Sequence, residues 1–207
     1  MKNLKLIFLG LGCIAALSLT SCLGDDNNEN NGLTKTQISQ CLSAVVGNYS
    51  GKMIYAANNP ADIADKQDTL DINWTITSDT IVTIKDFPAK AIAENIVNID
   101  LKTALQEQNP KQDIKCLMAF VLNDPYIEFV LGPQKAEFPV FYKDQTHTLS
   151  VYFWTDYSYG DKALSSNLMV LHMTMGAVFL DTDEETNLAS STGAKTVAIP
   201  YIITTNL

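Results

Sequence analysis

The sequence contains no arginine, and only two of its 207 residues are histidine. Without arginine the chain lacks the planar guanidinium that binds phosphates and carboxylates through two parallel hydrogen bonds. Acidic residues outnumber basic ones by 23 to 14, which gives a formal net charge of −9 at pH 7. Because a polyanion would be repelled by such a chain, we do not expect nucleic acid as a partner.

Motifs for catalysis and metal binding are equally scarce. His147 and His172 have no cysteines or carboxylates beside them at a spacing typical of zinc sites. The acidic run from Asp181 to Asn187 lacks the glycine and the final glutamate of an EF-hand, which predicts a solvated loop, with a looser calcium site as the alternative. No Gly-x-Ser-x-Gly elbow and no phosphate-binding glycine loop is present. We therefore predict a non-enzymatic protein without metal or cofactor.

The sequence does carry an export signal at its beginning. Lys2 and Lys5 precede an apolar stretch that ends at Leu19 and is shorter than the roughly twenty residues of a membrane-spanning helix. The run Leu19-Thr20-Ser21-Cys22 resembles the bacterial lipobox, in which a small residue precedes a lipid-modified cysteine. We predict that residues 1–21 are a signal peptide and that lipidation of Cys22 anchors the protein to a membrane.

A tether is predicted over residues 22–32, which are rich in Asn and Asp and offer little to bury. Acidic residues soon after the lipidated cysteine resemble the signal by which Bacteroides-type bacteria export lipoproteins to the outer face of the outer membrane. That resemblance implies a surface-exposed protein of the cell outer membrane. A plain solubilising linker is the alternative.

Residues 33–207 are long enough for a single domain with its own core. A short helix is predicted first, because Thr34 and Gln37 form a capping box before an apolar stripe that stops at Gly47. Beyond it the apolar period falls to two, as in Leu70 to Ile76, which is typical of strands with one buried face. The nine β-rich runs are 49–56, 70–76, 80–85, 114–122, 126–131, 138–142, 148–154, 168–180 and 196–204.

One long interruption, residues 89–108, contains good helix formers and predicts a helical insert, with Asp100 placed to cap a second turn. Many short strands with few helices predict an all-β, mainly antiparallel fold. We favour a barrel because the long run 168–180 can bend at Gly176, and a two-sheet β-sandwich is the alternative. Pro139 and Pro200 lack the amide hydrogen of a central strand and are predicted to lie at edges or bulges.

Two groups of residues beyond Cys22 are candidates for a site. Cys41 and Cys116 are the remaining thiols of the mature chain, and a disulfide between them would close a loop of about 75 residues. The alternative is two separate buried thiols. Trp154, Tyr157 and Tyr159 lie beside carboxylates and hydroxyls, a combination that suits sugar rings and protein hot spots. We predict that these three aromatics bind a ligand, the alternative being that they close the end of the core.

Four features together resemble a lipoprotein family of Bacteroides species, the domain of unknown function 4840. They are the lipobox, the run Val46-Gly47-Asn48-Tyr49-Ser50-Gly51-Lys52-Met53, the strand around Trp74, and Lys85-Asp86-Phe87-Pro88 before the helical insert. The resemblance spans most of residues 33–207. It implies a lipocalin-like antiparallel fold and brings no catalytic residues.

These observations predict a lipid-anchored cell-envelope lipoprotein that acts as a non-catalytic binding or accessory module. A small apolar molecule or a glycan in the barrel mouth would require a lined cavity open to the outside. The alternative is a partner-binding component of an outer-membrane complex, which would require an exposed aromatic patch. A carboxylate-dependent hydrolase is a third reading and would require convergent carboxylates in a cleft.

Overall fold

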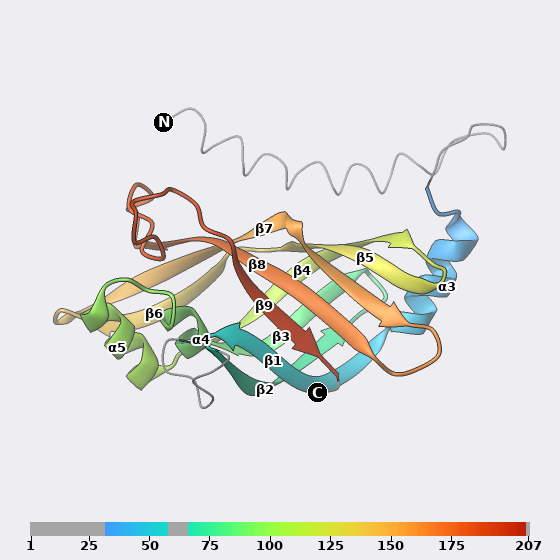
Figure 1. Ribbon diagram of the computed structural model, residues 1–207, viewed down its shortest axis with the longest axis horizontal. Helices are drawn as coiled ribbons and strands as arrows, with labels where there is room; N and C mark the ends of the chain where they lie inside the picture. Colours follow the sequence, from blue (N-terminus) through green and yellow to red (C-terminus); the bar gives the residue numbers. More distant parts are fainter. Residues whose placement is uncertain (1–31, 58–65, 206–207) are drawn as a thin grey trace.

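The computed structural model describes residues 32–57 and 66–205. Nine strands in these residues form one antiparallel sheet, and eight of them close into a barrel (Figure 1). The strands are β1 (Gly47–Ala56), β2 (Gln67–Ile76), β3 (Ile81–Pro88), β4 (Lys111–Leu122), β5 (Tyr126–Pro133), β6 (Ala136–Tyr142), β7 (Gln145–Ala163), β8 (Met169–Leu180) and β9 (Ile199–Thr204). The helices of the described part are α3 (Lys35–Val45), α4 (Ala89–Ala93) and α5 (Ile99–Gln108).

The strands of the barrel run up and down in chain order, except that β6 is passed over. β5 pairs with β7, from Tyr126 beside Ala163 to Val130 beside Tyr159, so β6 stays outside the ring and pairs with β7 alone. β1 pairs with β9 and completes the ring. This is the connectivity of up-and-down barrels such as lipocalins. The predicted antiparallel barrel is therefore confirmed, and the two-sheet sandwich is not formed.

Helix α3 begins as predicted and ends differently. The Thr34 side chain accepts a hydrogen bond from the Gln37 amide, and the Gln37 side chain accepts one from the Thr34 amide, which completes the capping box. The expected stop at Gly47 was wrong. Val46 already has extended backbone angles, and Gly47 is the first residue of β1. The chain turns directly from helix to strand, so no left-handed glycine cap is needed.

The predicted helical insert forms two helices, α4 and α5. Asn98, not Asp100, caps α5, because the Asn98 side-chain oxygen accepts a hydrogen bond from the Leu101 amide at 3.0 Å. Asp100 lies in the first turn, where its negative charge is favourable next to the helix N-terminus. The predicted cap was therefore two residues late, because either residue type can accept from the amides of a first turn.

Large side chains fill the interior of the barrel. Trp74, Phe129 and Tyr201 have no exposed surface, so no space large enough for water adjoins them. Packing is tight at Gly160 on β7, where an added Cβ would lie 2.3 Å from the Phe129 ring and 2.8 Å from the Leu171 side chain. Glycine is required at this position because real Cβ atoms do not approach other atoms so closely. The described part of the barrel has no ligand-sized cavity beside these residues.

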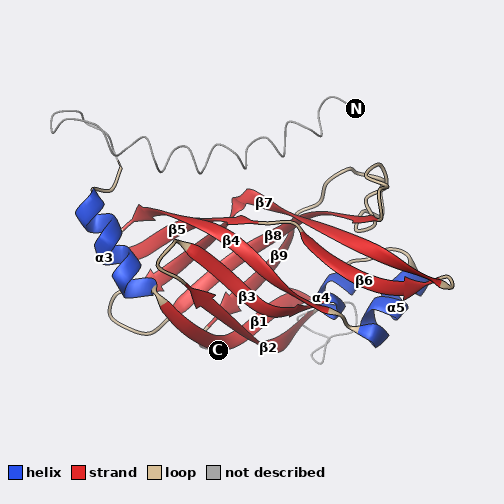
Figure 2. Cartoon of the chain, turned by 180° about the vertical axis from the view of Figure 1, so that it is seen from behind, coloured by secondary structure: helices blue, strands red, loops and turns tan. Residues whose placement is uncertain are grey.

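Helices cover both ends of the barrel (Figure 2). At one end α3 buries Cys41 and Val45, and the Tyr49 hydroxyl donates to the Val45 carbonyl at 2.6 Å. At the other end the four residues of α4 that are buried include Ile92, which has no exposed surface. The Tyr201 ring meets the Phe87 ring edge to face, with centroids 5.4 Å apart. The barrel is therefore closed along its axis as well as filled.

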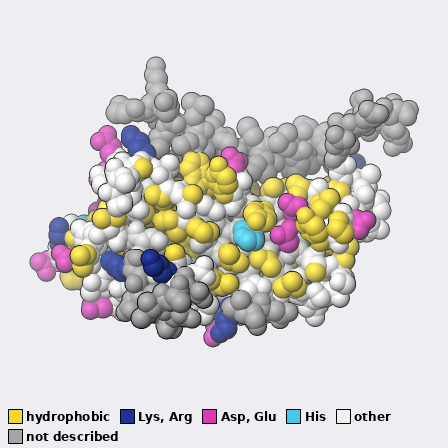
Figure 3. Space-filling view, in the orientation of Figure 1, with side chains coloured by type: hydrophobic (Ala, Val, Ile, Leu, Met, Phe, Trp, Pro, Cys, Tyr) yellow, Lys and Arg dark blue, Asp and Glu magenta, His cyan; other side chains and the backbone are white. Residues whose placement is uncertain are grey.

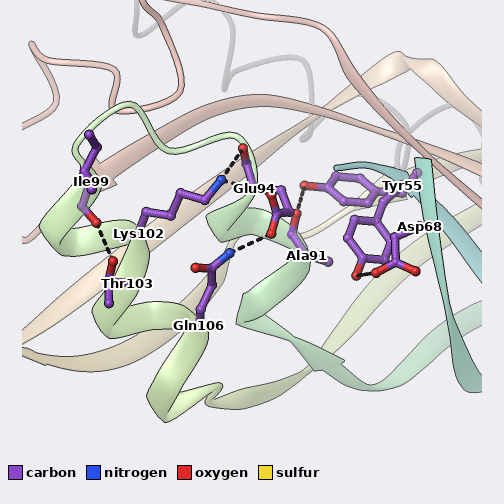
Figure 4. Close-up of polar contacts among 9 residues, drawn as sticks. Tyr55, Asp68, Ala91, Glu94, Ile99, Lys102, Thr103 and Gln106 are labelled. Carbon is purple, nitrogen blue, oxygen red and sulfur yellow. Dashed lines mark hydrogen bonds and ion pairs between the residues drawn. The ribbon is translucent and has the colours of Figure 1, made fainter. Parts of the chain in front are cut away.

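Polar contacts hold the helical insert together next to the barrel (Figure 4). The Tyr201 hydroxyl of β9 joins the insert to the barrel by donating to the Ala91 carbonyl of α4 at 3.5 Å. Glu94 follows α4 and accepts hydrogen bonds from two side chains of α5, Lys102 at 2.9 Å and Gln106 at 2.6 Å. Nearby, the Tyr55 hydroxyl of β1 donates to Asp68 of β2 at 3.2 Å. Burial, together with the Asp68 carboxylate, raises the pKa of Tyr55 to about 12. Tyr55 therefore remains a neutral donor at this end of the barrel.

The free edge of β6 is closed by the chain itself. The Gln108 side chain donates to the Phe141 carbonyl and accepts from the Phe141 amide, both at 2.8 Å, as a neighbouring strand would. Pro139 has no amide hydrogen on this edge. Pro200 lies where β9 pairs only with β8, because the pairing with β1 ends at Tyr201. β6 is therefore an edge strand, as predicted from Pro139, whereas the prediction was wrong for Pro200, because β9 lies between β1 and β8 and tolerates the proline only beyond the end of its pairing with β1.

β7 and β8 continue beyond the barrel as a three-stranded extension with β6. Tyr152 pairs with Ala177 and Phe153 with Met175, so Gly176 is left without a partner and the strands bend there, as predicted. Beyond this bulge β6, β7 and β8 are in register, and α5 lies against β6 (Figure 1). The extension is the only part of the described sheet that lies outside the ring.

Replacing Gly160 by valine is expected to reduce the free energy of unfolding by about 1–3 kcal/mol, because the interior cannot accept added carbons without strain. Urea unfolding followed by tryptophan fluorescence measures this change. The control is Gly32→Ala, since no atom lies within 4 Å of a Cβ added at Gly32. Equal stability of the valine variant and the wild type would contradict a filled barrel.

Candidate functional site

The three aromatics that we predicted to bind a ligand differ in their surroundings, although the Trp154 and Tyr157 rings meet edge to face with centroids 6.2 Å apart. Tyr157 and Tyr159 lie on the outside of the barrel, with 61% and 37% of their surface exposed. Trp154 is partly buried, and its Nε1 donates to the Val197 carbonyl at 2.8 Å. Its ring also covers Gly176, since an added Cβ there would lie 2.8 Å from Nε1. Trp154 therefore supports the backbone, and only the two tyrosines are offered to a ligand.

A rigid bulge in β7 turns Tyr157 outward. Trp154 pairs with Thr174 and Tyr159 with His172, so the longer stretch of β7 faces a shorter stretch of β8. The buried Ser158 hydroxyl donates to the Trp154 carbonyl at 2.5 Å and accepts from the Thr174 amide at 3.1 Å. The Thr174 hydroxyl donates to the Tyr157 carbonyl at 2.9 Å. These hydrogen bonds take the place of the backbone pairing with β8 that is interrupted between Trp154 and Tyr159, and they fix the position of Tyr157.

Tyr159 belongs to a row of outward-facing side chains that crosses β7, β8, β9 and β1. The register places Tyr159 beside His172, His172 beside Ile202, and Ile202 beside Ile54. Side chains paired in this way have Cβ atoms about 5 Å apart. We define the outer strip as Tyr157, Tyr159, His172, Ile202 and Ile54. Figure 3 shows hydrophobic side chains gathered around a histidine on this face.

The outer strip is uncharged at neutral pH. The His172 ring stacks on the Tyr159 ring, with centroids 4.4 Å apart and planes 15° from parallel. Burial lowers the pKa of His172 below its ordinary value of 6.5, although the Asp161 carboxylate acts in the opposite direction. His172 is therefore neutral at pH 7 and adds a flat aromatic surface to the strip.

An acidic border lies next to the outer strip. In the adjacent cross-strand row Glu128 of β5 stands beside Asp161 of β7, close to the Tyr159 end. At the opposite end of the row Lys52 is bound to Asp71, with nitrogen and oxygen 2.7 Å apart. The positive charge of Lys52 is thus compensated locally. The border at the aromatic end is negative.

A second surface feature is a groove of about 510 Å³ on the three-stranded extension. We call it the polar groove. It is lined by Lys135, Glu137, Thr148, Ser150, Tyr152, Phe179, Asp181, Thr182 and Glu184. From the sequence we selected Trp154, Tyr157 and Tyr159 as aromatic site residues but not Tyr152. The alternation of side chains along β7 could have shown that Tyr152 is distinct from the outer strip. Only the pairing of β7 with β6 and β8 brings the other lining residues next to Tyr152.

Tyr152 stands at the centre of the contacts in the polar groove. Its hydroxyl donates to Glu184 at 3.1 Å, and the Phe179 ring supports its ring in an edge contact at 5.7 Å. The ammonium of Lys135 is paired with Glu137 and lies 6.0 Å from the centre of the Tyr152 ring. Burial and the bond to Glu184 raise the pKa of Tyr152, so its hydroxyl stays protonated. The ring is held from several sides.

Asp181 closes the other end of the polar groove. Its carboxylate accepts a hydrogen bond from the Thr148 amide at 2.9 Å and lies 2.7 Å from Nδ1 of His147. These two contacts, the amide first, lower the pKa of Asp181. The carboxylate is therefore ionised at neutral pH and fixed in place, and His147 serves to position it.

A smaller hollow of about 310 Å³ lies at the end of the barrel beside α3. It is bordered by Ala44 and by the turn after β7, with Lys162 as its charged residue. The Lys162 ammonium donates to the carbonyls of Ala163 at 3.2 Å and Ser166 at 2.5 Å. Lys162 thus holds the turn together, and we assign no ligand to this hollow.

The remaining predicted sites give three findings. Cys41 and Cys116 are free, buried thiols, so the structure shows the alternative of two separate cysteines and not the bridge. Burial raises the pKa of Cys116 to about 12, which makes it unreactive. No group of three or more His, Cys, Asp or Glu side chains in the described residues could hold a metal ion. Cys22, the predicted signal peptide and residues 22–31 of the predicted tether lie outside the described residues.

None of the helices in the described residues is both long and apolar enough to span a membrane.

Replacing His172 by glutamine is expected to flatten the pH dependence of stability. The folded protein resists protonation of His172, whereas the unfolded chain takes up the proton near pH 6.5, so the wild type loses stability as the pH falls through and below that value. The glutamine variant lacks this loss. Urea unfolding at about pH 7.5 and about pH 5.5 measures the difference. An identical pH dependence in both proteins would contradict a partly buried, neutral His172.

Comparison with known proteins gives one family. No curated protein and no solved structure matches the chain. A family model described as Domain of unknown function (DUF4840) matches residues 44–180, from the end of α3 to the end of β8. The match includes eight of the nine strands and covers more than half of the chain. The protein therefore belongs to the DUF4840 family.

Proposed function

We propose that this protein is a lipid-anchored lipoprotein of the cell envelope whose barrel is a non-catalytic module for binding a protein partner. The observation that carries this proposal is an uncharged outer strip on a barrel whose interior is filled. Exposed apolar surface that is contiguous and rimmed by polar residues is typical of interaction sites. Tyrosine at the centre of such a surface is typical of binding hot spots.

A ligand inside the barrel is less well supported. Such a ligand requires a lined cavity that opens to solvent. Here Trp74 and Phe129 leave no space beside them, and α3 and α4 cover the two ends. The small apolar ligand that we considered from the sequence would find no space beside these side chains in the described part of the barrel. Binding on the outside of the wall makes use of the side chains that the barrel does present.

The chemistry of the outer strip defines the kind of partner. Tyr157, Tyr159 and neutral His172 offer aromatic surface, which favours an apolar centre on the partner. Glu128 and Asp161 border this surface, so lysine or arginine at the rim of the partner would be attracted. A chain with a net charge of −9 would also repel a second copy of itself. We therefore propose a different protein with an apolar centre and a basic rim.

The anchor suits this arrangement. Residues 22–32 would connect Cys22 to α3, and α3 covers one end of the barrel (Figure 1). The outer strip lies on the side wall, on β7, β8, β9 and β1. A barrel tethered by its α3 end would present the strip sideways to a neighbour in the same membrane. A component of an outer-membrane complex on the cell surface is the partner class that we propose.

Replacing Cys22 by alanine is expected to release the protein from the membrane fraction of its host, because a lipid chain contributes roughly 0.8 kcal/mol for each buried methylene. Cell fractionation and intact mass spectrometry of the purified protein measure the location and the added acyl mass. Cys13→Ala is the matched control within the signal peptide and should leave both unchanged. A Cys22→Ala protein that keeps the acyl mass would contradict the anchor.

A photoreactive benzoylphenylalanine placed at Tyr157 is expected to cross-link the partner in host cells. Adding Tyr159→Asp should reduce the adduct at least about tenfold, which corresponds to about 1.4 kcal/mol, because a charge would be buried at the interface. Tyr126→Asp is the matched control, since Tyr126 is 38% exposed on β5 and lies outside the outer strip. The cross-linked peptide should carry lysine or arginine. An adduct that survives Tyr159→Asp, or an acidic peptide, counts against the proposal.

A further inference from the structure

We propose that the polar groove binds a neutral saccharide. The groove lies on β6, β7, β8 and the loop after β8, whereas the outer strip lies on the barrel wall. Trp154 and the bulge at Gly176 stand between the two along β7. The inference is therefore independent of the proposed protein partner. The volume of the polar groove, about 510 Å³, is within the usual range of ligand sites.

The groove offers both donors and acceptors of hydrogen bonds. Lys135 can only donate, the ionised carboxylates can only accept, and the hydroxyls of Thr148 and Thr182 can do both. A sugar hydroxyl also donates and accepts, so it needs both kinds of group within reach. A simple ammonium ion can only donate, so it would leave the Lys135 donor unused. A polyhydroxylated ligand matches this set better than a cation does.

The Tyr152 ring supplies the apolar part of the site. One face of a sugar ring consists of C–H groups, which pack against the flat face of an aromatic side chain. Phe179 beneath holds the Tyr152 ring by an edge contact, and the hydroxyl is fixed by Glu184. The orientation of the ring is therefore set before any ligand arrives. Such preorganisation reduces the entropy lost on binding.

The carboxylates of the groove are also fixed in advance. Glu137 is paired with Lys135, Glu184 accepts from Tyr152, and Asp181 is held by the Thr148 amide and His147. Each carboxylate oxygen can accept about two hydrogen bonds, so these contacts do not exhaust their capacity. A ligand would meet acceptors whose positions are already defined.

The charge of the groove argues against acidic sugars. Three carboxylates, Glu137, Asp181 and Glu184, face the single ammonium of Lys135, and the ammonium is already paired. The excess negative charge would repel a uronic acid or a sialic acid. The absence of arginine from the whole chain removes the usual binding group for a sugar carboxylate. The groove therefore favours a neutral saccharide over an acidic one.

The test uses the full chain in a detergent without a sugar headgroup, because a glycosidic detergent would itself occupy the site. Neutral tetrasaccharides of glucan, mannan, galactan and xylan are titrated, with tetragalacturonate as the charged probe. Saturation-transfer NMR detects binding, and calorimetry gives the Kd. We expect at least one neutral tetrasaccharide to bind and tetragalacturonate to bind more weakly.

Variants then locate the site. Tyr152→Ala should weaken the affinity for the best neutral tetrasaccharide by about tenfold or more, and Glu184→Gln by about threefold or more. Glu184 lies in an exposed loop, so its variant remains informative if the loss of Tyr152 disturbs the fold. Tyr159→Asp, in the outer strip, should leave saccharide binding unchanged. No neutral binding, tighter binding of the charged probe, or unchanged binding by both groove variants overturns the proposal.

Discussion

The filling of the barrel interior is the constraint on which the rest of the structure depends. Eight strands enclose a space that side chains can just fill. At Gly160 the β5, β7 and β8 strands approach so closely that Phe129 and Leu171 leave no room for a Cβ. Because side chains fill the interior, a ligand or partner must bind to the outward-facing side chains of the strands. This separates the molecule from barrels of the same connectivity that hold a ligand inside.

Both surfaces that we propose for binding arise from the long strand β7. Its first part pairs with β6 and β8 in the extension and carries Tyr152, whereas its last part closes the barrel on β5 and carries Tyr159. Two irregularities, at Gly176 and between Trp154 and Tyr159, let one strand serve both sheets. The bulge hydrogen bonds of Ser158 and Thr174 are therefore as important for the surface as for the fold.

The sequence predicted the elements well and their assembly incompletely. Period-two alternation located all nine strands, although the predicted run 148–154 covers less than half of β7 (Gln145–Ala163), and the Thr34 and Gln37 capping box located α3, because these signals are local. The predicted helix end at Gly47 and the predicted cap at Asp100 were wrong by one or two positions. Helix α3 ends where Val46 adopts extended backbone angles, and the neighbouring Asn98 caps α5. No local signal says that β5 passes over β6 to pair with β7. The polar groove was missed because its residues meet only through the pairing of β7 with β6 and β8, which no local signal defines.

The acidity of the chain links the two proposed interactions with the proposed anchor. Removal of residues 1–21 would take away Lys2 and Lys5, and the formal charge would change from −9 to −9 − 2 = −11. Such a domain is repelled by an anionic membrane surface, so a lipid and a tether would hold it near the membrane without letting it lie flat. The same charge selects a basic rim on a protein partner and accepts an uncharged sugar. The negative charge therefore disfavours nucleic acid, acidic glycans and a second copy of the chain as partners. One feature of the composition thus restricts which nucleic acids, saccharides and proteins the chain can bind.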